Sequence, residues 1–307
     1  MRTVYSRLTN KKDIAMKKIL SSIFAIAAFA IAGNAQSIID AEDGHNPNDF
    51  YQQGIVVGKK AMPYPFLRES DVVWKTTIWR QIDFNESFNQ FFYFPFETEK
   101  NTQGRINLVN LIVNAAANGE FDVYENDDMK VPQEWEKAYA FLQGKQIRIR
   151  QGEEDEFGDV EEIIDTIPED FDPASAKMVQ LKEFWYIDKQ DTRQKVRIVA
   201  MSFKFSKNVL RAGQSEEVTD WTFWVPMDEM KVRQVLVNAN AFDENNDVAE
   251  RSYDDVFIQR YFDSYVTRES NKFNRKITDY LTGEDAMLES QLIEERIYDI
   301  ENDMWEY

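Results

Sequence analysis

The stretch EFWYIDKQDTRQKVRIVAMSFKF, residues 183–205, decides the fold that we expect for this chain. Residues 184–187 and residues 196–205 are rich in β-branched and aromatic side chains, which favour strands. Between them lies the polar run 188–191, which is typical of a turn. The pattern therefore predicts a β-hairpin.

Further elements are predicted on both sides of the hairpin. We expect strands at residues 221–225 and 232–237, a short strand around Ile147 and Ile149, and an acidic loop over residues 151–173. A helix that ends before Gly119 is also predicted. Its apolar face would be formed by Ile106, Val109, Ile112, Val113 and Ala116.

The C-terminal part is predicted to be helical. One helix is expected to carry a common face formed by Val256, Phe257, Arg260, Tyr261 and Tyr265. The last helix has an apolar stripe opposite a row of acidic residues, and the stripe comprises Leu288, Leu292, Ile293, Ile297, Ile300 and Met304. Mixed, mainly antiparallel strands in the middle, with helices before and after and a long C-terminal helix, predict an α+β fold.

Residues 70–96, SDVVWKTTIWRQIDFNESFNQFFYFPF, concentrate aromatic side chains in a strongly acidic chain. Ser70 and Asp71 suit the N-cap of a helix. The apolar face of that helix would be formed by residues spaced four apart, which are Trp74, Ile78 and Ile82. We accordingly expect Trp74 in the core of the subunit.

Other aromatic side chains of this stretch have no predicted place in the core. Trp79 lies off the expected helical face, and residues 91–94 are predicted to form a strand that is apolar on both faces. An uncovered aromatic surface usually marks an interface. We therefore expect Trp79, together with Phe91, Phe92 or Tyr93, to contact a neighbouring protein.

Residues 1–35 are predicted to be an N-terminal extension and a signal peptide. Met16 and two lysines precede an apolar run over residues 19–32, and small residues stand three and one positions before Gln36. This is the pattern of a cleaved secretory signal. The apolar run is shorter than the roughly 20 residues that span a bilayer, so a permanent anchor is the weaker alternative.

The remaining sequence divides into three parts. Glycine and proline punctuate residues 36–65, which are expected to form an extended arm that is either mobile or lies on another surface. Residues 66–250 are expected to form the α+β core. Residues 251–307 are expected to be a helical region of the same domain.

Charge limits the class of partner. The chain carries a net charge of −19, and because residues 1–35 hold six basic residues and one acidic residue, cleavage would leave −24. Such a field repels nucleic acid and anionic lipid and attracts a basic protein. No cysteine follows the cleavage site, so we expect no lipid anchor, no direct membrane insertion and attachment only through a partner.

Residues for catalysis or metal binding are scarce. With no cysteine and a single histidine, His45, the sequence offers no thiolate site and no histidine-based triad. Paired carboxylates are too frequent in this acidic chain to mark an acid–base site. The run DENND at residues 243–247 resembles a calcium loop, but Val248 and Asp254 replace the glycine and glutamate of an EF-hand. No catalytic, cofactor or metal residue is predicted.

Three blocks occur in order along the chain. The first is ESDVVWKTTIWRQIDFNESFN from Glu69, and the second is LKEFWYIDKQDTRQKVRIVAMS over residues 181–202. The third runs from Arg251 to the C-terminus and contains YDD, SYVTRESN and DMWEY. Together these blocks resemble the GldN/PorN family of gliding-motility proteins.

The resemblance implies a structural subunit of the type IX protein secretion and gliding-motility machinery. It implies a periplasmic ring formed by self-association and by a lipoprotein of the GldK/PorK type, which would hold the subunit at the inner face of the outer membrane. Motor components of the GldL/GldM type are further implied partners. No enzymatic activity and no cofactor are implied.

Two other function classes remain open from the residues themselves. A periplasmic ligand-binding protein would use the aromatic side chains to line a pocket with converging polar groups. A hydrolase would need two facing carboxyl groups in a cleft, roughly 5–10 Å apart.

We predict that the exported protein begins at Gln36. Intact-mass measurement and N-terminal sequencing of protein recovered from the periplasm check this. A mature chain that still contains residues 19–32 would instead indicate a membrane-anchored protein.

Overall fold

The computed structural model describes residues 59–96, 105–143, 145–154, 160–168, 170–191, 193–211, 214–243, 246 and 250–305. All of them belong to one compact unit, Lys59–Tyr307. The predicted signal peptide and the predicted arm up to residue 58 lie outside the described residues.

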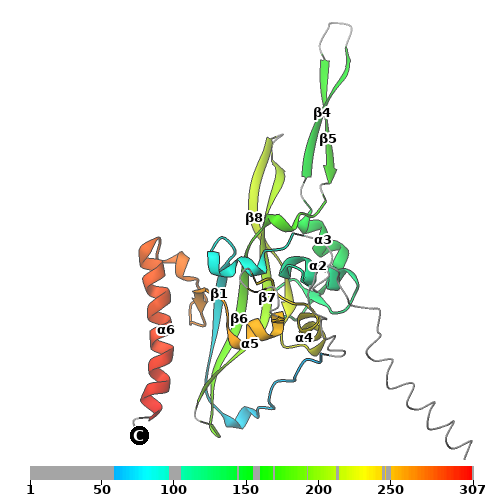
Figure 1. The fold of residues 1–307 in the computed structure, drawn as a ribbon. Helices are drawn as coiled ribbons and strands as arrows, with labels where there is room; N and C mark the ends of the chain where they lie inside the picture. The colour runs from blue at the N-terminus through cyan, green and yellow to red at the C-terminus, as the bar shows by residue number, and fades with distance from the viewer. Residues whose placement is uncertain are drawn as a thin grey trace, which may run out of the picture. The chain divides into compact units, whose positions relative to one another are not determined.

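The centre of this unit is a seven-stranded sheet with the strand order β3-β2-β8-β7-β6-β1-β9 (Figure 1). Its strands are β1 Val72–Asp83, β2 Val123–Tyr124, β3 Pro132–Gln133, β6 Ala176–Asp188, β7 Gln194–Arg211, β8 Gln214–Pro226 and β9 Tyr265–Glu269. Every pairing in this sheet is antiparallel. A separate antiparallel pair is formed by β4 Lys145–Glu154 and β5 Val160–Pro168.

Helices precede and follow the strands. The α-helices are α2 Leu108–Ala117, α3 Trp135–Leu142, α4 Met230–Val237, α5 Tyr253–Gln259 and α6 Glu284–Trp305. Short 3-10 helices are η1 Glu69–Asp71, η2 Ser87–Phe92, η3 Pro173–Ser175 and η4 Ile277–Asp279. The predicted α+β fold, with its long C-terminal helix, is confirmed.

The hairpin predicted from residues 183–205 is confirmed as β6 and β7. Their register places Trp185 opposite Val196 and Val179 opposite Phe203. Directly opposed residues of an antiparallel pair share one face of the sheet. The hairpin therefore presents matching apolar side chains to the same side, and β1 and β8 pair with its two outer edges.

Helix α2 is also confirmed, with the boundaries that its caps explain. The side chain of Asn107 accepts a hydrogen bond of 2.7 Å from the backbone N–H of Asn110, which satisfies one free donor of the first turn. Gly119 follows the helix with φ of +71°, a left-handed conformation that suits glycine.

The helix predicted after Ser70 and Asp71 is wrong, because residues 72–83 form strand β1. Trp74, Ile78 and Ile82 are separated by four residues, a spacing that fits one face of a helix and equally one face of a strand. Tertiary pairing decides between them, since β1 lies between β6 and β9 and bonds to both.

Four other local predictions are corrected. Residues 232–237 form helix α4 instead of a strand, and residues 91–94 follow or end η2 instead of forming a strand. The acidic loop predicted over residues 151–173 is interrupted by strands, because residues 151–154 end β4 and residues 160–168 form β5, which pairs with β4. Helix α5 stops at Arg260, whose backbone is left-handed at φ 54°, so Tyr265 belongs to β9.

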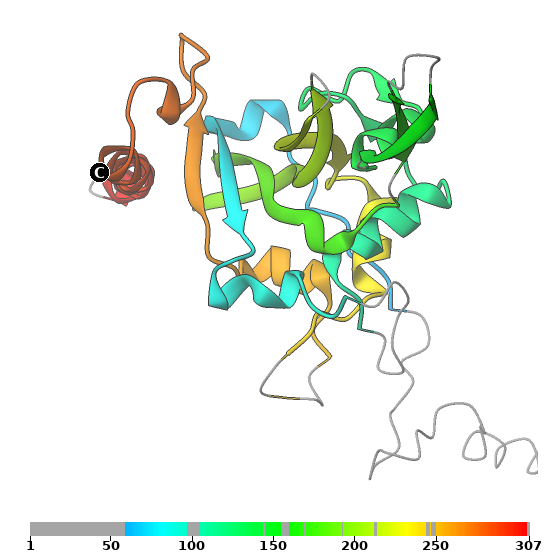
Figure 2. The same ribbon diagram turned by 90° about the horizontal axis from the view of Figure 1, so that it is seen from above.

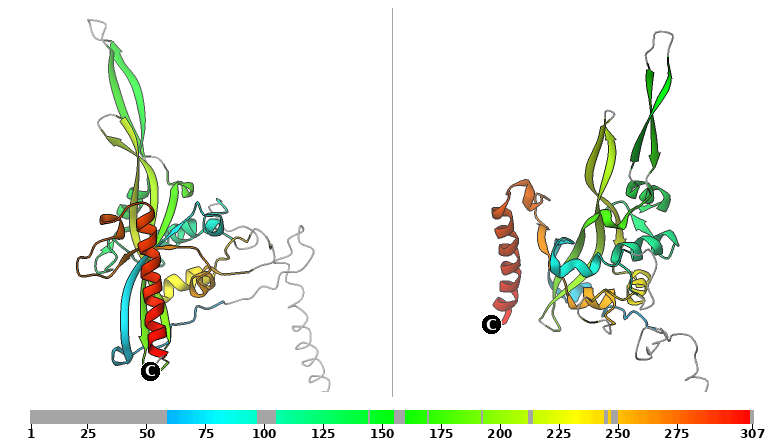
Figure 3. Two further views of the ribbon diagram at one scale, coloured as in Figure 1. Left: turned by 90° about the vertical axis from the view of Figure 1, so that its left-hand side faces the viewer. Right: turned by 45° about the horizontal axis from the view of Figure 1, so that its top comes forward.

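Two apolar clusters hold the helices to the sheet. The main core contains Phe203, Phe223 and Leu181 of the sheet and side chains of α2, α4, α5 and η2. The second cluster joins α6 to the sheet through Ile78, Trp185, Val266, Ile277, Ile293 and Ile297. Figures 2 and 3 show α6 on the β9 side of the sheet.

Charged groups are buried beside the second cluster. The side chain of Glu183 is 0% exposed and accepts hydrogen bonds from the Trp185 indole at 2.8 Å and from Arg260 at 2.7 Å. Arg80 lies 3.3 Å from the same carboxylate and 2.7 Å from the carboxylate of Glu294 on α6. Glu183 therefore ties the sheet to the end of α5 and, through Arg80, to α6.

The last residues of the predicted arm lie against the folded unit. Arg233 of α4 donates two hydrogen bonds, of 2.9 and 2.8 Å, to buried Asp254 and a third to the backbone oxygen of Met62. The Tyr64 ring lies against two guanidinium groups, 4.4 Å from that of Arg233 and 4.8 Å from that of Arg197. Residues 59–65 are thus held by α4 and β7.

Replacing Glu183 by Gln tests the buried charge cluster. We expect the free energy of unfolding to fall by about 3–5 kcal/mol, because partly buried Arg260 would lose its carboxylate partner and buried Arg80 would keep only Glu294. Urea unfolding followed by circular dichroism measures the loss. The exposed Glu120→Gln is the matched control, with an expected change within about 0.5 kcal/mol. An equally small change for Glu183→Gln would contradict the cluster.

Candidate interaction site

Trp79, the first residue expected at an interface, is buried within this chain. Only 7% of the residue is exposed, and its ring packs with Ala200 and Trp224. It lies on the face of β1 opposite Ile78, because neighbouring residues of a strand point to opposite sides. The expectation that Trp79 remains uncovered in the isolated subunit is therefore wrong.

The polar edge of Trp79 is also satisfied inside the chain. Its indole N–H donates to the Asp127 carboxylate at 3.0 Å. Arg268 donates to the same carboxylate at 3.0 Å, and its guanidinium lies 3.5 Å from the centre of the Trp79 ring. Lys182 lies 3.5 Å from that carboxylate. The Trp79 side chain of β1 is therefore held by Arg268 of β9 and by Asp127, which Lys182 of β6 also contacts.

Phe92 and Tyr93 serve the core as well. Phe92 is 0% exposed, and its ring stacks on those of Tyr253 and Phe257 at centroid distances of 6.1 and 5.6 Å. Tyr93 is half-buried and donates from its hydroxyl to the backbone oxygen of Ala174 at 2.8 Å. Burial, followed by the charge of Asp172, raises the pKa of the Tyr93 phenol.

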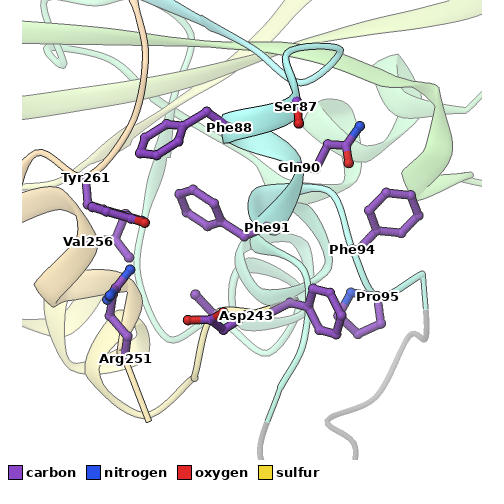
Figure 4. A pocket seen from close by; sticks show the side chains of 12 residues that line it. Ser87, Phe88, Gln90, Phe91, Phe94, Pro95, Asp243, Arg251, Val256 and Tyr261 are labelled. Atoms are coloured by element: carbon purple, nitrogen blue, oxygen red, sulfur yellow. The ribbon is translucent and has the colours of Figure 1, made fainter. Parts of the chain in front are cut away.

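Phe91 differs from these residues because it lines a pocket. The pocket has a volume of about 720 Å³ and lies between η2, helix α5 with its flanking residues, and the segment around Phe242. Its wall is formed by Ser87, Phe88, Gln90, Phe91, Phe94, Pro95, Ala241, Phe242, Asp243, Arg251, Val256 and Tyr261. Figure 4 shows Phe88, Phe91 and Tyr261 on one side and Phe94 with Pro95 on the other.

The aromatic wall of this pocket is internally packed. The rings of Phe88 and Tyr261 lie 4.9 Å apart, and those of Phe91 and Tyr261 lie 6.0 Å apart. The guanidinium of Arg251 lies 4.1 Å from the Tyr261 ring, in cation–π contact. Arg251 and Asp243 give one end of the pocket a basic and an acidic group. Such a pocket suits an apolar group next to a polar one.

The four residues predicted as an interaction site thus have different environments. Trp79 and Phe92 are buried in separate clusters, Tyr93 is anchored to Ala174, and Phe91 lines the pocket. Their role in contacting another protein stays a prediction for Phe91 and Tyr93, which retain exposed surface.

The pocket was missed because its parts are far apart in the sequence. Residues 87–95 and residues 241–261 come together only when η2 and α5 pack on the same core. One local signal existed, since Phe88 and Phe91 are three residues apart and so lie on one side of a 3-10 helix. The role of Asp127 left no such signal, because its partners lie on three different strands.

The last position of the calcium-like run is occupied by another contact. Asp254, its twelfth position, is bound to Arg233, and positions 244, 245 and 247–249 lie outside the described residues. Across the ranges that the structure describes, no group of three histidine, aspartate or glutamate side chains is placed to hold a metal ion.

Comparison with known proteins gives one family. A family model described as "Gliding motility associated protein GldN" matches residues 67–306. The matched span includes the sheet, the pocket and α6. No curated protein sequence matches the chain.

Replacing Trp79 by Ala separates a core role from an interface role. We expect the free energy of unfolding to fall by about 3–5 kcal/mol, because the cavity left by a buried ring cannot close. Trp79→Phe loses the hydrogen bond to Asp127 and should cost about 1 kcal/mol. Urea unfolding measures both.

A matched control for these variants is Phe66→Ala. Phe66 is 89% exposed, so its removal should change the free energy of unfolding by less than about 0.5 kcal/mol. If Trp79→Ala behaved like this control and only weakened binding to another protein, the burial of Trp79 would be disproved.

Proposed function

The chain belongs to the GldN family of gliding motility associated proteins, and on that premise we propose that it is a structural subunit of the type IX secretion and gliding machinery. The family match over residues 67–306 carries the proposal. It is supported by the three sequence blocks, which meet in the fold around Glu183.

The proposed site of action is the periplasm. The signal-peptide pattern of residues 1–35 would export the chain, and the lack of cysteine leaves no residue for a lipid anchor. A lipoprotein partner of the GldK/PorK type would hold the subunit at the inner face of the outer membrane. None of the described helices combines the length and the apolar character needed to cross a bilayer.

The proposed assembly is a ring with two kinds of contact. Self-association in a closed ring uses two unlike surface patches on each copy, because one copy meets its neighbours head to tail. The lipoprotein partner and motor components of the GldL/GldM type require further surface. A charge of −24 after export favours basic patches on these partners. We propose no enzymatic role, no cofactor and no nucleic-acid partner.

The pocket beside Phe91 supports a second candidate function. Its aromatic wall and its charged end, formed by Arg251 and Asp243, are features of a ligand-binding protein. Native mass spectrometry of the protein purified from the periplasm tests this candidate. A bound small molecule that is lost on Tyr261→Ala would favour it over a purely structural subunit.

The assembly proposal predicts a stable complex in the periplasm. A tagged chain should co-purify with an outer-membrane lipoprotein, and electron microscopy of the complex should show closed rings. The measurement is the composition and the size of the purified particle. A chain that sediments as a monomer even with its lipoprotein partner present would contradict the proposal.

A further inference from the structure

Helix α6 packs on the sheet with one side only. Ile293 and Ile297 are each 2% exposed and belong to the cluster with Ile78 and Trp185. Ser290 lies on the same side and accepts a hydrogen bond of 2.8 Å from the backbone N–H of Val266 in β9. The predicted apolar stripe of α6 is therefore only partly buried.

The opposite side of α6 carries a second stripe. Leu288, Leu292, Glu295 and Asp299 are spaced four, three and four residues apart, so they follow one line along the helix. Leu288 is 51% exposed and Leu292 is 55% exposed. Glu295 and Asp299 are exposed as well. The outer stripe is thus apolar in its first half and acidic in its second half.

Among the residues that the structure describes, the two carboxylates of the outer stripe are not part of an ion pair. Elsewhere on α6, Glu294 is paired with Arg80, and Arg296 is paired with Glu269. Within the described part of the chain, no basic side chain is paired with Glu295 or Asp299. Among the described elements, none lies over the outer side of α6 in the left view of Figure 3.

We propose that this outer stripe, Leu288, Leu292, Glu295 and Asp299, is a docking surface for a basic amphipathic helix of a partner protein. The inference deepens the proposed function, on which it rests, by assigning one contact surface and the chemistry of its partner. The partner helix would set apolar side chains against the leucines and lysine or arginine side chains against the carboxylates.

The length of the stripe sets the size of the partner segment. Leu288 and Asp299 are separated by eleven residues, which corresponds to about 16 Å along a helix. A partner helix of about three turns is enough to cover it.

Two other occupants are disfavoured by charge. A second copy of the same stripe in parallel would place carboxylates against carboxylates. In antiparallel packing each carboxylate would lie against leucine and lose its water without gaining a partner. An anionic lipid surface would be repelled by the carboxylates and by the net charge of the chain. A basic protein helix satisfies both halves of the stripe.

The test uses two fluorescein-labelled helical peptides and the mature protein purified from the periplasm. One peptide, of about 18 residues, carries two leucines followed by two lysines along one stripe at the spacing of α6. The second peptide has glutamate in place of those lysines. Fluorescence anisotropy measures binding. We expect the lysine peptide to bind at least about tenfold more tightly than the glutamate peptide.

Protein variants locate the binding surface. Leu288→Gln combined with Leu292→Gln should weaken binding of the lysine peptide by about tenfold or more. Ile258→Gln, on the 52% exposed Ile258 of α5, is the matched control and should leave binding unchanged. Glu295→Lys combined with Asp299→Lys should reverse the preference in favour of the glutamate peptide. All variants should keep the melting temperature, because the altered side chains are exposed.

Specific outcomes would overturn the inference. It fails if the leucine variant binds the lysine peptide as the control does, or if the charge reversal leaves the peptide preference unchanged. The leucine variant is also expected to lose partners in periplasmic co-purification. A complex that survives the leucine substitutions overturns this inference alone, whereas a wild-type chain that purifies without partners overturns the proposed function.

Discussion

The arrangement of the other elements depends on the ion pairs that the buried carboxylate of Glu183 forms with Arg80 and Arg260. Its charge is shared by Arg260 at the end of α5 and by Arg80 of β1, and Arg80 reaches on to Glu294 of α6. A charge removed from water is tolerated only when it is paired and hydrogen-bonded. Each of the three sequence blocks supplies a member of this cluster, so their order in the chain reflects one meeting point in the fold.

The aromatic residues of the N-terminal block have mostly a structural role. Trp79 is clamped by Asp127 and Arg268, and Phe92 is stacked in the main core. Aromatic rings bury a large area for each residue, so they fill space on both faces of the sheet, with Phe92 in the main core and Trp79 against Ala200 and Trp224. Exposed apolar side chains lie elsewhere, among them Leu288 and Leu292 on the outer stripe of α6.

The contrast between a packed aromatic interior and exposed apolar side chains at the periphery suits a subunit of a larger assembly. A rigid centre, held by the hairpin β6–β7 and by the Glu183 cluster, can carry contact surfaces at its periphery without being reshaped by each partner. Residues 59–65 lie against α4, where Arg233 and Gln234 hold them, and not against α6. The acidic net charge favours the same class of partner that the outer stripe of α6 requires, a basic protein surface.

The sequence by itself determined the fold class, the β6–β7 hairpin, helix α2 and the long helix α6, because in these segments the apolar pattern fits one structure only. Tertiary structure decided the rest. Trp74, Ile78 and Ile82 fit a helix and a strand equally, and pairing with β6 and β9 selected the strand. The burial of Trp79 and the exposure of Leu288 and Leu292 depend on what packs above them. A local pattern states which side chains are apolar, but only neighbours distant in sequence decide which of them are covered.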